Sequence, residues 1–143
     1  MMLTIFGTIL IGYVNTPYIW AGNTFQGLDC SGYVLKALHD YGVTLPDMSA
    51  QQIYLWASKQ DENYNCEPTE PDCLLFFGSD TDNISHIEVS LGEGYMIGAS
   101  GAGKNSINMT LDELAEKDAR VKIKKISTRR DLVASIKLGE KHE

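Results

Sequence analysis

The chain has 143 residues, 43% of them apolar and 22% charged, with a formal net charge of -7. This length and composition predict one globular domain, residues 1–143, with a single hydrophobic core. An acidic chain without a basic stripe is a poor match for nucleic acid and for anionic lipid, so we expect neither nucleic acid nor membrane as a partner.

The three cysteines, Cys30, Cys66 and Cys73, have an irregular spacing that does not indicate a disulfide framework. Cys66 and Cys73 could pair across a loop, but nothing in the sequence requires it. There are three histidines and His142 lies in the C-terminal tail, so a Cys/His zinc cage is not expected. We therefore expect no metal and no cofactor.

Residues 1–14 are apolar, but they lack the basic segment and cleavage site of a signal peptide and are too short for a membrane span. We predict a helix here that packs on the core and ends where Pro17 breaks it. The protein is thus expected to be made in the cytoplasm without a secretory signal. In the loop that runs from Pro17 to Gly27, Tyr18 and Trp20 suggest a cleft wall; core packing is the alternative, and we favour it for Trp20.

Cys30 stands directly before a helical pattern that stops at Gly42. It therefore lies in or beside the first turn of a helix, whose free N–H groups and dipole favour a thiolate, the nucleophilic form. A small buried cysteine that only fills space is the alternative. The apolar positions that recur at three- and four-residue spacing are Tyr33, Val34, Ala37, Leu38 and Tyr41.

Four short segments predict strands, because they alternate or are continuously apolar: 74–77, 84–91, 95–99 and 121–126. The first is predicted to be buried, and the last carries exposed lysines, as an edge strand does. A turn-rich linker over 78–83 and a turn at 92–94 join the first three. The strand over 84–91 has two faces, one with His86, Glu88 and Ser90 and the other with Ile87, Val89 and Leu91.

Three further helices are predicted, over residues 48–58, 111–117 and 128–139. Asp47 or Ser49 caps the first of them, and Thr110 caps the second. Residues 59–71 form a polar surface loop, and 140–143 a frayed tail. Because helices come first and a mostly antiparallel sheet second, the pattern predicts the α+β fold class.

Six segments, in this order, resemble the NlpC/P60 class of bacterial and phage cell-wall cysteine peptidases and cover roughly residues 10–105. The resemblance implies a compact papain-like (NlpC-type) domain, with N-terminal helices packed on a mostly antiparallel β-sheet and the nucleophilic cysteine at a helix N-terminus. The segments are Pro17-Tyr18-x-Trp20-x-Gly22, Asp29-Cys30-Ser31-Gly32, Leu45-Pro46 followed by Gln51 or Gln52, Leu74-Leu75-Phe76-Phe77, Ser85-His86-Ile87 and Gly94-x-Met96-Ile97-x-Ala99.

The resemblance also implies roles for individual residues. Cys30 is the implied nucleophile, and His86 the general base that takes the thiol proton and later protonates the leaving amine. Tyr18 matches a tyrosine whose hydroxyl helps hold the oxyanion, with the Cys30 backbone N–H as the other donor. The implied substrate is the stem peptide of peptidoglycan, usually cut between γ-D-glutamyl and a diamino acid. Positions that match the lining of the substrate cleft are Asp29, Ser31 and Ser85.

The residues themselves also favour His86 as the base, because His39 lies about 13 Å along the helix axis from Cys30, at ~1.5 Å per residue. Three positions depart from the family pattern, and the last of them leaves a dyad, a relocated third role, or lost activity. They are Pro71-Asp72-Cys73 in place of Pro-Gly-Asp, Glu88 in place of a glycine, and Gly98 in place of the third catalytic residue, usually a histidine.

The predicted hairpin suggests where the third role has moved. A three-residue loop at 92–94 pairs Leu91 with Tyr95, Val89 with Ile97 and Glu88 with Gly98. Directly opposed Cβ atoms lie on the order of 5 Å apart, so Glu88 would fill the space that Gly98 leaves empty. Glu88 shares a strand face with His86 and could accept from its imidazole N–H. We predict a Cys30–His86–Glu88 arrangement, with a Cys30–His86 dyad and a solvated Glu88 as the alternative.

The leading interpretation is a cysteine peptidase that hydrolyses an amide bond in peptidoglycan stem peptides. One alternative is a binding or structural component without turnover, such as a phage tail piece. Another is an acyltransferase or amidase that uses the same nucleophile on a different substrate. Without a signal peptide, we expect a phage or prophage product that reaches the bacterial cell wall in a virion or by another secretion route, with a virion or secretion-system partner.

Overall fold

The structure, a computed structural model, describes residues 2–19, 23–24, 27–101 and 110–139. The predictions for Trp20 and for the tail at 140–143 therefore lie outside the described residues. The helices are α1 (Ile5–Ile11), α2 (Cys30–Tyr41), α3 (Ala50–Lys59) and α4 (Leu111–Glu116), with a 3-10 turn at Ile126–Thr128. The strands are β1 (Asn23–Thr24), β2 (Gly27–Leu28), β3 (Tyr64–Asn65), β4 (Cys73–Asp80), β5 (Asn83–Gly92), β6 (Tyr95–Ser100), β7 (Arg120–Lys125) and β8 (Leu132–Lys137).

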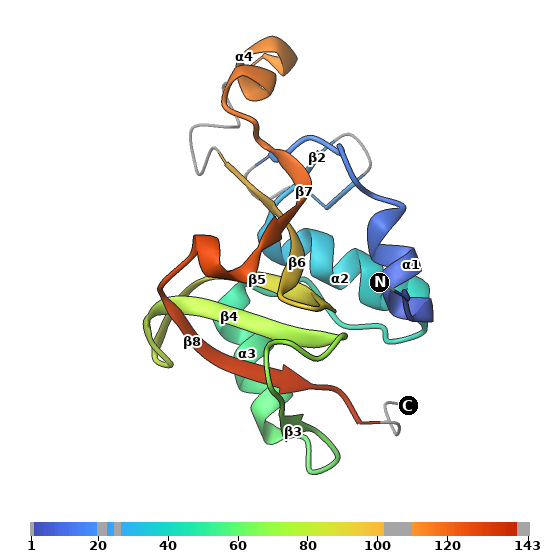
Figure 1. The fold of residues 1–143 in the computed structure, drawn as a ribbon, viewed down its shortest axis with the longest axis vertical. Coiled ribbons are helices and arrows are strands. Elements are labelled where there is room, and N and C mark those ends of the chain that lie inside the picture. Colours follow the sequence, from blue (N-terminus) through green and yellow to red (C-terminus); the bar gives the residue numbers. More distant parts are fainter. Residues whose placement is uncertain (1, 20–22, 25–26, 102–109, 140–143) are drawn as a thin grey trace.

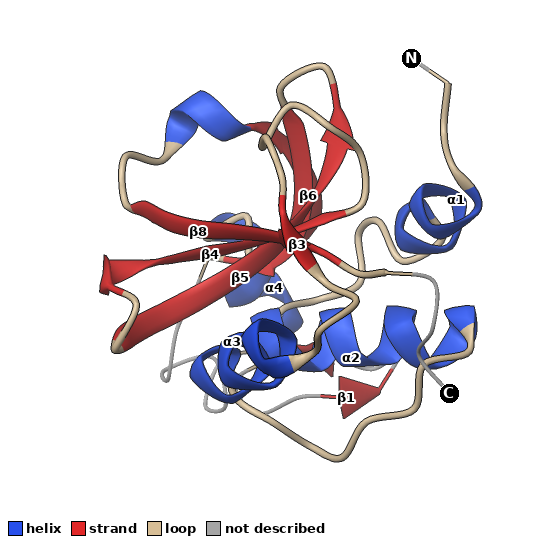
Figure 2. Ribbon diagram, turned by 90° about the horizontal axis from the view of Figure 1, so that it is seen from below, coloured by secondary structure: helices blue, strands red, loops and turns tan. Residues whose placement is uncertain are grey.

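Within the described ranges, six strands form one antiparallel sheet in the order β3-β8-β4-β5-β6-β7, as Figure 1 shows. Figure 2 shows α2 and α3 against one face of this sheet, with α1 beside α2. The predicted α+β architecture is therefore confirmed, with N-terminal helices packed on an antiparallel sheet. The predicted edge strand is confirmed as well, because β7 is the last strand of the order.

The first helix is shorter than predicted and is fixed by its own cap. α1 begins after Thr4, whose hydroxyl oxygen accepts the Gly7 N–H at 2.9 Å. Phe6 and Leu10 bury its inner face in the core. Among the described residues, no helix has both the length and the apolar character needed to cross a membrane.

Capping residues determine where the two helices that border the site begin. Asp29 precedes α2 and accepts the Gly32 N–H at 2.6 Å, and Gly42 ends the helix in the left-handed region at φ 107°. Ser49 caps α3 in a capping box with Gln52, which decides between the two predicted caps. These caps fix where each helix starts, and both starts face the same cleft.

The side chain of Gln51 ties α3 to the hairpin of β4 and β5. Its Nε2 donates to the Thr81 carbonyl at 2.9 Å, and its Oε1 accepts the Ile84 N–H at 2.7 Å. The predicted linker over 78–83 is wrong as a loop, because β4 continues to Asp80 and β5 begins at Asn83. The hairpin thus carries the start of β5 directly to the helix layer.

β5 shows the predicted alternation, but both of its faces are buried. Ile87 and Val89 pack in the main core against the helices. On the other face lies a second apolar cluster, formed by Cys73, Leu75, Phe77 and Met96. The side chains of His86, Glu88 and Ser90 are therefore buried polar groups rather than a solvated face.

The predicted register of the β5–β6 hairpin is confirmed at Val89, next to Glu88, but not at the turn. Val89 pairs with Ile97, as predicted. The pairing of Leu91 with Tyr95 is wrong, because a register shift places Gly92 opposite Tyr95. The register shift lies on the turn side of Val89, and the predicted closeness of Glu88 to Gly98 is present, since a Cβ atom built at Gly98 would lie 2.5 Å from Glu88 Cγ.

The predicted helix over 128–139 is wrong. After the 3-10 turn the chain forms β8, which lies between β3 and β4 and pairs Ile136 with Leu74. A short apolar run such as 132–136 fits either a helix turn or a buried strand, and pairing with two strands favours the strand. The helix capped by Thr110 is confirmed, as α4.

The loop over 59–71 carries the short strand β3 and one half of a disulfide. Cys66 and Cys73 are bonded to each other, which is the pairing that the sequence left open. With Glu70 they make up a cluster of metal-ligand type among the described residues, but the disulfide engages both sulfur atoms. Neither cysteine lies in the cleft described below.

Candidate active site

A hollow of about 400 Å³ opens between the starts of α2, α3 and β5. It is lined by every predicted residue of the nucleophile, oxyanion and cleft positions: Tyr18, Asp29, Cys30, Ser31 and Ser85. The rest of its wall, which the sequence analysis did not assign to the site, comes from the connector into α3, the first turn of α3 and the start of β5: Asp47, Met48, Ser49, Ala50, Gln52 and Ile84. The cleft has the size of a small-ligand site.

Cys30 is the first residue of α2 and is the free cysteine of the chain. The pKa of its thiol is raised to about 11, chiefly by burial and to a smaller extent by the nearby carboxylates of Asp29 and Glu88. Backbone N–H groups of Ile87 and Ser31 act in the opposite direction, because they donate to the sulfur. The helix terminus favours a thiolate, as the sequence predicts, but burial outweighs it here and favours the thiol, so a base is needed to take the proton.

His86 lies on β5, one residue before the N–H group that reaches the Cys30 sulfur. Its ring is buried beside Phe77, with ring centroids 5.8 Å apart. Its Nε2 atom is 2.7 Å from Glu88 Oε2. Among the described residues, no hydrogen bond joins His86 to Cys30, and His86 is not one of the residues that line the cleft, although its neighbour Ser85 is.

Glu88 has no exposed surface, yet its pKa is held below the usual range. Burial raises this pKa, but the hydrogen bond to His86 and the charge of Lys124 outweigh it. Lys124 Nζ lies 2.8 Å from Glu88 Oε2 and 3.2 Å from Ser100 Oγ. The predicted contact between Glu88 and the imidazole is present, and the alternative of a solvated Glu88 is wrong.

Tyr18 is held in the cleft by backbone pairing with the edge of the sheet. Its N–H donates to the Ala119 carbonyl at 3.0 Å, and Pro17 forms a bridge with Arg120. Its phenol is buried, which raises its pKa, and the charges of Cys30 and Asp29 raise it further. A phenol that keeps its proton is available as a hydrogen-bond donor towards the cleft.

A pair of charged residues beside His86 was not predicted. Arg129 and Asp131 pair through two hydrogen bonds of 2.9 and 2.7 Å, and the guanidinium lies 4.7 Å from the centroid of Phe77. The wrong helix over 128–139 concealed them, because their position depends on how β8 enters the sheet.

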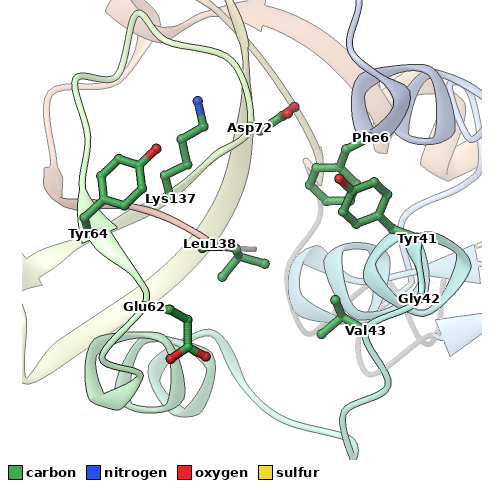
Figure 3. A pocket seen from close by; sticks show the side chains of 10 residues that line it. Phe6, Tyr41, Gly42, Val43, Glu62, Tyr64, Asp72, Lys137 and Leu138 are labelled. Carbon is green, nitrogen blue, oxygen red and sulfur yellow. The ribbon is translucent and has the colours of Figure 1, made fainter. Parts of the chain in front are cut away.

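A larger hollow lies elsewhere among the described residues. Figure 3 shows this space of about 1020 Å³, with Phe6 and Tyr41 on one side and Tyr64 and Lys137 on the other. It contains none of the predicted site residues. The smaller cleft at Cys30 is therefore the candidate active site.

The sequence model of the NlpC/P60 family matches residues 15–125 of the chain. A γ-D-glutamyl-L-lysine dipeptidyl-peptidase of Bacillus cereus is 31% identical over 87 residues, which are 59% of this chain and 25% of that protein. The chain thus spans about a quarter of the length of this relative.

Solved structures show the same fold. The NlpC/p60 domain of the peptidoglycan hydrolase SagA aligns with a TM-score of 0.66 at 20% identity, over 93% of this chain and 96% of that one. RipD of Mycobacterium tuberculosis, described as a non-catalytic NlpC/p60 domain protein adapted to peptidoglycan binding, aligns with a TM-score of 0.64 at 16% identity, over 92% of each chain.

Proposed function

The chain belongs to the NlpC/P60 family, and from this membership we propose that it is a cysteine peptidase that hydrolyses an amide bond in peptidoglycan stem peptides. The observation that carries the proposal is the cleft itself. It gathers Tyr18, Asp29 and Cys30 at the start of α2, next to the strand that carries His86. The bacterial cell wall is then the proposed place of action.

In the proposed reaction, His86 takes the proton of the Cys30 thiol as the sulfur attacks the carbonyl carbon of the substrate. A carbon–sulfur bond forms, and the carbonyl oxygen takes up negative charge. When the carbon–nitrogen bond breaks, His86 returns the proton to the leaving amine. Water then hydrolyses the thioester, with His86 as base, and restores the thiol and a new carboxyl group.

Two donors are proposed for the oxyanion of this reaction. One is the backbone N–H of Cys30, at the N-terminus of α2 where N–H groups have no helical partner. The other is the hydroxyl of Tyr18, which keeps its proton. Both belong to groups that border the same cleft.

The proposed scissile bond lies between γ-D-glutamyl and a diamino acid. The name of the Bacillus cereus relative supports this choice, although the chain covers only a quarter of that protein. The carboxylate of Asp29 at the cleft suits a cationic group of the substrate, and Ser31 and Ser85 offer hydroxyls for its backbone.

A second candidate function is peptidoglycan binding without turnover. Two observations favour it: the structural neighbour RipD is described as non-catalytic, and the Cys30 thiol has a raised pKa. The buried His86–Glu88 pair favours the peptidase, because a binding surface does not require a buried ionised carboxylate beside a histidine.

The test is incubation of the purified protein with a mixture of muropeptides, followed by mass spectrometry. A peptidase yields pairs of fragments whose masses sum to the substrate plus one water, and Cys30→Ala yields none. Acyl transfer yields adducts without added water. Unchanged masses, together with retention of the muropeptides on the immobilised protein, would contradict the peptidase and support the binding function.

A further inference from the structure

A single carboxylate oxygen connects the proposed base to a cation. Oε2 of Glu88 lies 2.7 Å from His86 Nε2 and 2.8 Å from Lys124 Nζ. The other oxygen, Oε1, is buried without a hydrogen-bond partner among the described residues. A fully buried carboxylate is costly unless it is paired, so these two contacts account for its presence here.

The absence of a side chain at position 98 makes this arrangement possible. Gly98 lies on β6, the strand between β5 and β7, and Lys124 projects from β7, where it pairs with Met96. A Cβ atom at position 98 would lie 2.5 Å from Glu88 Cγ and 2.8 Å from its Oε1. The side chain of Glu88 thus occupies the space above Gly98, within reach of both His86 and Lys124.

We infer that Glu88 is the residue that positions His86, and that Lys124 keeps Glu88 in place as a carboxylate. This inference rests on the proposed function, in which His86 is the base. An ionised carboxylate can only accept hydrogen bonds, so Nε2 of the neutral imidazole must carry the hydrogen. Nδ1 is then left as the acceptor for the thiol proton of Cys30.

Titratable groups from several elements lie near the pair. Lys124 comes from β7, Cys30 and Tyr33 from α2, and Arg129 and Asp131 from the segment before β8. Arg129 and Asp131 already pair with each other at 2.7 Å, whereas Lys124 pairs directly with Glu88. Removal of the Lys124 ammonium would let Glu88 take up a proton at a higher pH, and a protonated carboxyl can donate to Nε2 instead of accepting from it.

The experiment reads the His86 ring directly, by nitrogen-15 NMR of protein labelled in its histidines. We expect the Nε2–H tautomer for His86 in the wild-type protein at slightly alkaline pH. Glu88→Gln should lose this fixed tautomer, because an amide can either accept from Nε2 or donate to it. A wild-type ring that carries its hydrogen on Nδ1 would overturn the inference.

Lys124→Met tests the second half of the inference, and Lys122→Met is its matched control. Lys122 lies two residues away on the same strand and pairs with Asp118 rather than Glu88. The carbon-13 resonance of the Glu88 carboxyl should titrate at a clearly higher pH in Lys124→Met than in Lys122→Met. Equal titration in the two variants would contradict a role for Lys124.

Turnover separates positioning from a purely structural role. Glu88→Gln should lower kcat by about 10²-fold or more while KM stays near the wild-type value. The His86 ring would lose its fixed tautomer and orientation, whereas the residues that line the cleft would be unchanged. Glu88→Gln leaves the Lys124 ammonium without its carboxylate partner, which could make this variant fold poorly. The double variant Glu88→Gln/Lys124→Met removes both charges and avoids this problem. Unchanged kcat in both variants would overturn the inference.

The NMR experiment needs no substrate, so it tests the inference separately from the proposed function. A wild-type protein that shows the expected tautomer but cleaves nothing would contradict the proposed function alone.

Discussion

At the scale of single residues, the site depends on how burial and charge act on one thiol. Cys30 lies at the start of a helix, as activated cysteines often do, but burial and two nearby carboxylates raise the pKa of its thiol and favour the protonated form. The sulfur is therefore a nucleophile only when a base removes that proton during the attack. In the proposed reaction the activation therefore comes from His86 rather than from the helix dipole, which is worth at most about 2 kcal/mol at a partly buried helix end.

The pH dependence of alkylation tests this state of the thiol. Iodoacetamide should label Cys30 alone in the unreduced protein, because Cys66 and Cys73 are bonded. With the pKa of Cys30 raised to about 11, the labelling rate should keep rising with pH through the neutral and mildly alkaline range. A rate that reaches its plateau below pH 7 would indicate a preformed thiolate and contradict this assignment.

Tyr18→Phe tests the proposed oxyanion donor, because it removes one hydroxyl and keeps the ring that packs in the cleft wall. Loss of one such donor typically lowers turnover by ~10²–10³. We expect this fall in kcat with little change in melting temperature, since the backbone pairing of Tyr18 is untouched. Steady-state kinetics and thermal unfolding of the two proteins measure both quantities; a wild-type kcat would rule out the role.

At the scale of elements, the alternation of β5 places Ile87 and Val89 in the main core and His86 and Glu88 together on the opposite face. The period of two in residues 84–91 was enough to predict which side chains share the face of His86. What it did not predict is that this face is buried, since the cover comes from the apolar cluster around Phe77 and Met96. Burial is what turns Glu88 from a surface charge into a fixed partner of His86.

Gly98→Ala tests the close approach of β6 to Glu88. A methyl group there would lie 2.5 Å from Glu88 Cγ, and the Glu88 carboxylate is held by two partners, so it cannot move aside freely. We expect a loss of about 1–3 kcal/mol in the free energy of unfolding, which is the usual effect of overpacking. The same substitution in a Glu88→Ala background should cost clearly less; equal costs in the two backgrounds would show that the two positions do not interact.

At the scale of the whole molecule, the sheet order brings together segments that are far apart in the sequence. The helix-start cysteine, the strand histidine and the antiparallel sheet were predictable, because each rests on local periodicity or on a recognisable motif. Lys124, Arg129 and Asp131 were not, since they reach the site only through the placement of β7 and β8 in the sheet. A strand inserted between two others, as β8 is, leaves no local signal that separates it from a helix turn.

The buried carboxylate also predicts how stability depends on pH. Because the pKa of Glu88 is lower in the folded protein than in the unfolded chain, its contribution is present above the ordinary carboxyl range and is lost as the pH falls through the folded value. The difference in unfolding free energy between the wild type and Glu88→Gln should therefore shrink on acidification. Urea unfolding at a series of pH values measures it; a difference that grows towards acid pH would contradict the lowered pKa.

The most direct test of the whole account is the rate at which wild-type protein and Cys30→Ala cleave defined stem peptides. The peptides carry a γ-D-glutamyl bond to L-lysine or to meso-diaminopimelate, and chromatography quantifies the released fragment. The account predicts cleavage of at least one peptide by the wild type and a fall in kcat/KM of about 10³-fold or more in Cys30→Ala, with a nearly unchanged melting temperature. A Cys30→Ala protein that retains wild-type kcat/KM, or a wild-type protein that cleaves neither peptide, would contradict it.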